Sequence, residues 1–212
     1  MNYYTHFTVL FFFIISSLSY SQKNLDYQQP RKEILDLVNV DRAPSVLKDD
    51  KNHYMVFVYR PEYKSIDELS QKEMRLGGLR VNPYLNIGSR TTYYDKVKIL
   101  RLKKGDKVPI EVKGLPANPK LSNFVYSPDQ SKIAMINTTS SRLELWVLNI
   151  EKALATKINT PSLNATLGSV INWFSDNKSL LIKIRSENSN IIIDQEKNIP
   201  TGPTITENMG DK

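Results

Sequence analysis

The sequence has 212 residues, a formal net charge of +7 and no cysteine. The lack of cysteine excludes disulfides, thiolate metal sites and a cysteine nucleophile, and a hydrophobic content of 40% excludes a disordered chain. Acidic residues are interspersed with the basic ones, and no basic stripe carries interleaved aromatic residues, so nucleic acid is not an expected partner.

The first predicted element is the apolar segment "FTVLFFFIISSL", residues 7–18. It is too short to span a bilayer, which takes roughly 20 apolar residues. Small residues at Ser19 and Ser21 predict cleavage between Ser21 and Gln22, so residues 1–21 are interpreted as a signal peptide. We therefore expect an exported protein, periplasmic or secreted, with no stable membrane span after cleavage. Because the segment before the apolar run has no Lys or Arg, an uncleaved N-terminal anchor is the alternative.

A polar N-terminal extension, residues 22–42, follows, with at most one or two helical turns in "RKEILDLV". The next segment, "APSVLKDDKNHYMVFVYR", predicts a turn and then a strand over residues 54–59. Beyond it, Ser65 and Glu68 form a capping box that predicts a short helix over residues 66–76, ended by Gly77 and Gly78. Residues 79–94 are predicted to be a loop, with turns at residues 82–83 and 87–88.

Strands resume with "KVKILRL", residues 96–102, and a hairpin turn at residues 105–106 leads to a return strand in "VPIEVKGL". Four further short antiparallel strands are expected between residues 121 and 159. The stretch "VYSPDQSKIAM", residues 125–135, places a tight turn between two of them, and "NWFSDNKSLLI", residues 172–182, repeats its pattern. Asp129 and Asp176 occupy matching positions, so both are interpreted as turn residues.

Four-stranded units recurring at roughly 40 to 50 residues are typical of β-propeller blades. We therefore predict an all-β fold: an incomplete propeller over residues 43–212 with blades at about 43–116, 117–160 and 165–212 and one short helical insertion. Two unrelated hairpins of similar composition are the alternative. Because a closed ring takes about four to eight blades, we expect the rest to come from a longer protein or from further copies of the chain.

Few residues offer catalytic chemistry. Beyond the predicted signal, His53 is the sole histidine, placed beside a predicted surface turn, and no G-x-S-x-G segment occurs. No metal site and no cofactor are expected, because cysteine is absent and histidine nearly so, and Asp49 and Asp50 are interpreted as a solvated turn.

One segment is unusual: "MRLGGLRVNPYLNIGSRTTYY", residues 74–94, combines paired glycines with Arg75, Arg80 and Arg90. The guanidinium fork suits carboxylate recognition, and glycine lets a ligand approach the backbone. A loop that only packs against the sheets is the alternative.

These motifs, together with "VKGLPANPKLSNFVYSPDQSKIA", "NATLGSVINWFSDNKSLLIKI" and "IPTGPTI", resemble in order the N-terminal propeller of the prolyl oligopeptidase family of serine peptidases. The branch it resembles is the glutamyl-endopeptidase-like group, of the type found in Bacteroidetes. The resemblance implies a propeller that filters the access of peptides to an α/β-hydrolase domain, which holds the serine, aspartate and histidine of the triad. None of these three residues can be placed on this sequence.

The resemblance implies a propeller fragment of an exported glutamyl-endopeptidase-like peptidase, inactive alone, whose partners are the C-terminal peptidase domain and peptide substrates with acidic side chains. It makes Arg75, Arg80 and Arg90 the candidates for contacting a substrate carboxylate. The alternative is a non-enzymatic exported module of β-sheets that binds a peptide or an envelope component.

Overall fold

The computed structural model describes residues 28–38, 42–186 and 202. The chain divides into two units, residues 1–35 with 200–212, and residues 36–199. The predicted signal peptide, its cleavage site and nearly all of the last predicted blade beyond residue 186 lie outside the described residues. A seven-residue helix, α2 (Lys32–Val38), carries no buried residue. The rest is mostly β, in small antiparallel sheets with little helix.

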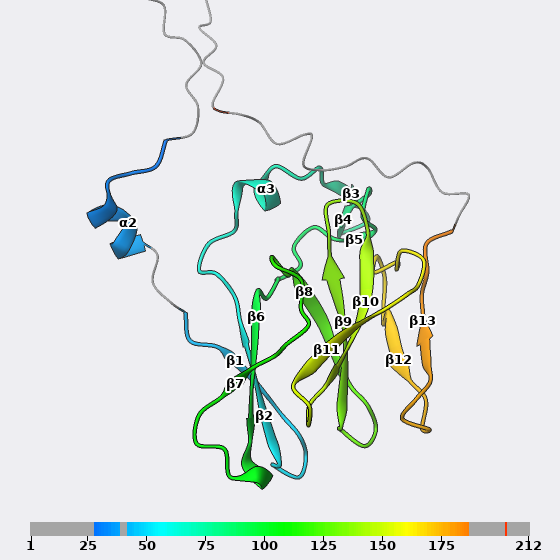
Figure 1. Cartoon of the computed structure of the whole chain (residues 1–212). Helices are drawn as coiled ribbons and strands as arrows, with labels where there is room; N and C mark the ends of the chain where they lie inside the picture. Colours follow the sequence, from blue (N-terminus) through cyan, green and yellow to red (C-terminus); the bar gives the residue numbers. More distant parts are fainter. Residues whose placement is uncertain (1–27, 39–41, 187–201, 203–212) are drawn as a thin grey trace, which may run out of the picture. The chain divides into compact units, whose positions relative to one another are not determined.

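The first sheet has four antiparallel strands in the order β1-β2-β6-β7 (Figure 1). One face carries the buried β-branched residues that alternate along β2 and β6, with Val56 opposite Ile99 and Val58 opposite Val97. This alternation is why these segments form strands with one core face. The strands are β1 (Ser45–Lys48), β2 (Tyr54–Tyr59), β6 (Lys96–Arg101) and β7 (Ile110–Glu111). A short 3₁₀ helix, Leu102–Lys104, precedes the predicted hairpin turn at residues 105–106 and is closed by Gly105 at a φ of 76°.

The second sheet confirms the predicted four strands between residues 121 and 159. Its order, β11-β10-β9-β8, is that of a simple meander. A bulge interrupts β8 between Ser122 and Val125, and Asn123 there has a φ of 53°. Its strands are β8 (Leu121–Tyr126), β9 (Lys132–Thr138), β10 (Leu143–Asn149) and β11 (Leu154–Ile158).

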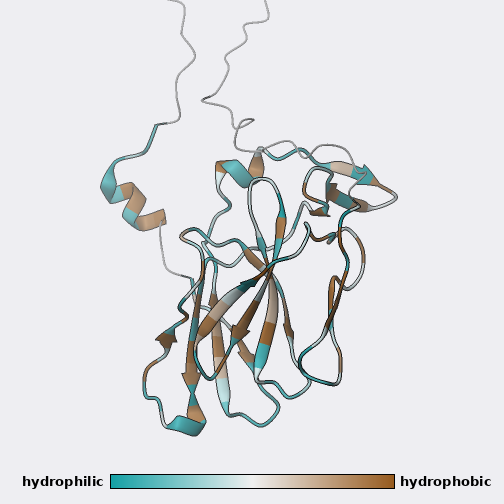
Figure 2. Ribbon diagram, turned by 45° about the vertical axis from the view of Figure 1, so that its right-hand side comes forward, coloured by the Kyte–Doolittle hydropathy of each residue, from teal (hydrophilic) through white to brown (hydrophobic). Residues whose placement is uncertain are grey.

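A third sheet pairs β12 (Ile171–Trp173) with β13 (Leu180–Ile182). Hydrophobic side chains fill the space between consecutive sheets, so the second sheet is buried on both faces. Figure 2 shows hydrophobic residues along the strands of these sheets. One cluster joins the first and second sheets, for example Val56 with Met135 and Trp146. The other joins the second and third sheets, for example Ile136 and Leu145 with Ile171.

The first two strands of each of these three sheets are connected by the same turn, which confirms the repeat expected from the sequence. In each turn a backbone N–H bonds to the carbonyl three residues earlier, and its residue has a positive φ: Asn52 (55°), Gln130 (60°) and Asn177 (57°). The Asp129 carboxylate accepts the Ser131 N–H at 3.0 Å. The Asp176 carboxylate accepts the Lys178 N–H in the matching position and, in addition, the Ser179 N–H. Both aspartates are therefore turn residues, as predicted.

The segment between β2 and β6, residues 60–95, is called the insertion below. The predicted helix over residues 66–76 is wrong beyond its first turn: α3 (Ile66–Leu69) is followed by the strand β3 (Met74–Leu76). Gly77 and Gly78, with φ of 53° and 88°, make a two-residue hairpin turn instead of a helix end. The predicted loop after them contains two strands, which with β3 form a small sheet: β4 (Leu79–Asn82) and β5 (Ile87–Gly88).

Candidate functional site

The insertion connects two strands of the first sheet, but it is anchored to the core between the second and third sheets. Leu85 and Ile87 are 1% and 2% exposed and belong to the core between the second and third sheets. Asn86 O accepts the Ala165 N–H at 2.7 Å, and Tyr84 O accepts Arg185 Nη1 at 2.7 Å. These contacts fix the insertion to the other sheets, so it is not a flexible loop.

Two of the three predicted arginines meet on the small sheet, around a glutamate that the sequence analysis missed. Glu73 Oε1 accepts Arg75 Nε at 2.9 Å and Arg80 Nη1 at 3.0 Å. Glu73 Oε2 accepts the Ser89 hydroxyl at 2.6 Å. We call these four residues the Glu73 cluster. They form a carboxylate held by two guanidinium groups and one hydroxyl.

These hydrogen bonds keep the carboxylate of the cluster ionised in acid. The Ser89 hydroxyl first, and then Arg75, lower the pKa of Glu73 from 4.5 to about 2. Its carboxylate, which is ionised at neutral pH in any case, therefore stays ionised well into the acidic range. The Arg75 side chain is 71% exposed and that of Arg80 34%, so the cluster faces solvent on the Arg75 side.

The third predicted arginine stands apart. Arg90 is exposed, and no hydrogen bond or ion pair joins its side chain to another of the described residues. The structure therefore brings together Arg75 and Arg80, with Ser89 beside Arg90 in the chain, and leaves the Arg90 guanidinium outside the cluster.

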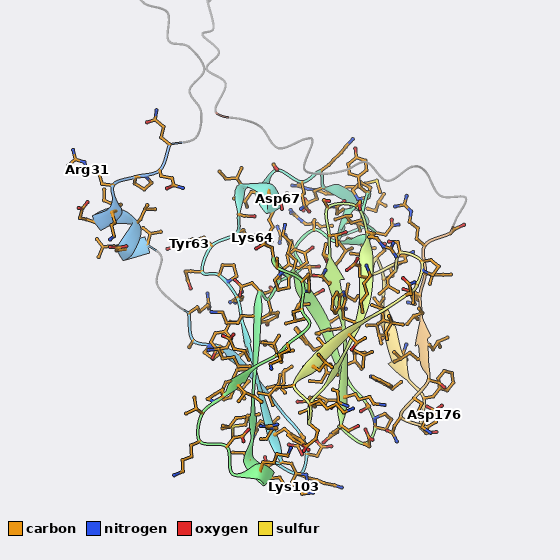
Figure 3. The ribbon with its side chains drawn as sticks, in the orientation of Figure 1. Arg31, Tyr63, Lys64, Asp67, Lys103 and Asp176 are labelled. Atoms are coloured by element: carbon orange, nitrogen blue, oxygen red, sulfur yellow. The ribbon has the colours of Figure 1, made fainter. Side chains whose placement is uncertain are left out.

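A polar cavity of about 260 Å³ lies where the insertion meets the second sheet. Asp67 of α3 and Lys120, just before β8, form an ion pair across it. Apart from Pro116, the rest of its lining carries amide and hydroxyl groups: Gln71, Asn118, Asn137, Thr138, Thr139 and Ser140. Figure 3 places Asp67 at one end of the sheets and Asp176 at the other, so this cavity lies at the end away from the repeated turns.

A buried carboxylate orients one of the cavity residues. Glu144 is 8% exposed and accepts hydrogen bonds from Asn137 Nδ2 at 3.2 Å and Trp146 Nε1 at 3.1 Å, and it forms an ion pair with Lys157. Burial alone would raise its pKa, but these donors, Lys157 foremost, lower it. Asn137 Oδ1 in turn accepts the Lys120 N–H at 3.0 Å. This network fixes the Asn137 amide beside the cavity.

The Asp49–Asp50 pair corrects another expectation. Asp49 is 4% exposed rather than solvated, and its Oδ1 accepts the Tyr54 N–H at 2.7 Å. Burial would raise its pKa, but the backbone N–H groups of Tyr54 and His53 lower it. His53 Nδ1 lies 3.7 Å from Asp49 Oδ2, so the histidine packs beside a structural carboxylate in the first repeated turn.

Within residues 28–38, 42–186 and 202, no three His, Cys, Asp or Glu side chains gather as metal ligands would. Among these same residues, no helix has the length and hydrophobicity needed to cross a membrane.

One sequence signal could have revealed the Glu73 cluster. Glu73 and Arg75 are two residues apart, the spacing that puts side chains on the same face of a strand. The prediction of a helix over residues 66–76 hid this signal, since residues two apart do not face each other on a helix. Ser89 could not be found in this way, because it reaches Glu73 through the pairing of β4 with β5.

The described part of the chain is thus mostly β, and its insertion presents an arginine and carboxylate cluster. Comparison of the whole sequence shows distant similarity to plant enzymes. It is 26% identical over 199 residues to the probable glutamyl endopeptidase, chloroplastic, of Oryza sativa subsp. japonica, covering 89% of this chain and 21% of that protein. It is 28% identical over 166 residues to the protein of the same description from Arabidopsis thaliana, covering 74% of this chain and 17% of that protein. The chain therefore spans about a fifth of the length of these relatives. No family model matches the sequence.

Proposed function

We propose that this chain is the N-terminal propeller part of an exported peptidase related to glutamyl endopeptidases, of the Bacteroidetes type. Its role is to gate and recognise acidic peptide substrates, while the bonds are cut in an α/β-hydrolase domain. The observation that carries the proposal is the similarity to two glutamyl endopeptidases over most of the chain.

Three features of the fold support a propeller. The first two sheets have the same strand order in space, from the first strand to the fourth. Consecutive sheets bury hydrophobic side chains against each other, and the same turn recurs in all three. Blades of a propeller are related in this way.

Two features support recognition rather than chemistry. The insertion brings guanidinium groups to one end of the sheets, and arginine pairs with carboxylates through charge-assisted hydrogen bonds. The sequence holds no G-x-S-x-G segment for a nucleophile. The export proposal rests on the apolar segment of residues 7–18 and on the small residues before Gln22.

The experiment that tests the division of labour is a hydrolysis assay. The purified 212-residue chain is incubated with a fluorogenic glutamyl peptide beside a full-length glutamyl endopeptidase. We expect turnover by the full-length enzyme and none by the chain. Turnover by the chain that a serine-directed inhibitor abolishes and that a His53→Ala variant retains would contradict the proposal, because it would require a catalytic site within these residues.

A further inference from the structure

The two arginines of the Glu73 cluster lie directly opposite each other. In the pairing of β3 with β4, Arg75 is the partner of Arg80. Like charges in this position repel and destabilise a strand pair. Two guanidinium groups opposite each other on this exposed hairpin therefore do not stabilise it unless an anion lies between them.

The three donor residues and the acceptor Glu73 are held by different kinds of backbone structure. Arg75 and Arg80 lie on paired strands, and Ser89 follows β5 with its N–H bonded to Arg80 O at 3.0 Å. Glu73 lies in the irregular link between α3 and β3, before the first paired residue, Met74. The donors are therefore fixed by the sheet, whereas the carboxylate is attached through a segment without its own backbone pairing.

The formal charges make the site attractive to an anion from solvent, with or without Glu73 in place. With Glu73 in place, the two guanidinium groups and one carboxylate sum to +1, and without it the site carries +2. The Arg75 side chain, 71% exposed, keeps most of its surface open to solvent. An external carboxylate can therefore approach the donors from solvent.

We propose that Arg75, Arg80 and Ser89 form a binding site for the side-chain carboxylate of a glutamyl peptide, and that Glu73 is its built-in occupant, which a substrate must displace. This inference rests on the proposed function for the identity of the ligand. Glu73 has the same side chain as the residue to be recognised, so the donor geometry around it is the geometry a bound glutamyl group would meet. Occupation by Glu73 weakens binding of free acidic peptides and makes the site selective for ligands with additional contacts.

The test is a binding measurement on the full 212-residue chain with two peptides, Ac-Ala-Glu-Ala-NH₂ and Ac-Ala-Gln-Ala-NH₂, followed by the NMR signals of the arginine Nε–Hε groups. In the Glu73→Ala variant we expect the Kd for the glutamyl peptide to fall by about tenfold, because a tethered competitor at high effective concentration has been removed. The glutaminyl peptide should gain nothing. Adding Arg80→Met to Glu73→Ala should abolish the gain.

The matched control is Glu111→Ala, which removes one negative charge from an exposed ion pair with Lys98 on the first sheet. It should leave the Kd unchanged. If Glu73→Ala does not fold, Glu73→Gln provides the same test while keeping the side chain's length.

An unchanged Kd in the folded Glu73 variant, or an equal gain for the glutaminyl peptide or in the Glu111→Ala control, would overturn the inference. None of these outcomes depends on a peptidase domain. Failure of the proposed function would appear instead as a full-length enzyme whose selectivity ignores the insertion.

Discussion

The insertion is predicted to be an integral part of the hydrophobic core, and Leu85→Ala tests this. Leu85 is 1% exposed and packs in the core between the second and third sheets. The substitution removes three buried carbon atoms at roughly 0.8 kcal/mol each, and the cavity left behind adds to this loss, so we expect the unfolding free energy to fall by about 3 kcal/mol.

The assay is urea denaturation followed by tryptophan fluorescence, with the same m-value for both proteins. Leu76→Ala is the control, because Leu76 is 54% exposed on the outer strand of the same insertion, and it should change the unfolding free energy by less than about 0.5 kcal/mol. Hydrogen exchange of the Ala165 N–H, which bonds to Asn86 O at 2.7 Å, adds a local readout. A loss below about 1 kcal/mol for Leu85→Ala would refute the reasoning, since the insertion would then not be part of the core.

Three further predictions concern the turns and links. Gly114→Ala should be strongly destabilising in thermal denaturation, because Gly114 has a φ of +82° and a Cβ there would lie 2.3 Å from Ala155 O. Gly105→Ala, at a φ of +76° with nothing within 4 Å, should cost only about 1 kcal/mol from backbone strain, and an equal loss at both glycines would show that the clash is not the cause. Asp49→Ala removes the acceptor of the N–H that begins β2 and should cost about 1 to 3 kcal/mol in urea denaturation at pH 7; no loss would mean that water replaces the carboxylate. Turn hydrogen bonds, the Ser179 hydroxyl first, lower the pKa of Asp176 from 3.8 to about 2, so its stabilising contribution is present above pH 4 and is lost as the pH falls toward 2. A carboxyl NMR titration should therefore give a midpoint near 2 for Asp176, and a midpoint near 3.8 would contradict the turn geometry.

Much of the sheet structure could be predicted because short alternating strands and turn residues are local signals. The segment from Leu121 to Ile158 forms the expected four strands, and Asp129 and Asp176 both proved to be turn residues. The insertion was harder. The capping box at Ser65 correctly predicts a helix start, since Ser65 Oγ accepts the Glu68 N–H at 3.2 Å, but it carries no information on where the helix ends. Pairing of β3 with β4 across Gly77 and Gly78 overrode the helical propensity.

The candidate site was also predicted only in part, because strand pairing brings some of its residues together. Arg75 and Arg80 were singled out for their side-chain chemistry, and the structure places them together. Glu73 was missed because the predicted helix hid its two-residue spacing from Arg75. Its bond to Ser89 depends on strand pairing between residues distant in the chain, and the burial of Asp49 depends on the packing around the first turn. These two tertiary effects leave no local pattern to detect.

We propose above that the insertion selects acidic substrates. The most direct measurement transfers residues 60–95 of this chain into a full-length glutamyl endopeptidase, in place of its corresponding segment, and compares kcat/KM for a glutamyl and a glutaminyl substrate. We expect the chimera to keep its preference for the glutamyl substrate, and the preference to fall about tenfold when the chimera carries Arg80→Met, the loss expected for one charge-assisted contact. Activity on the glutaminyl substrate reports that the enzyme is folded. A glutamyl preference that is the same with and without Arg80→Met would contradict the claim.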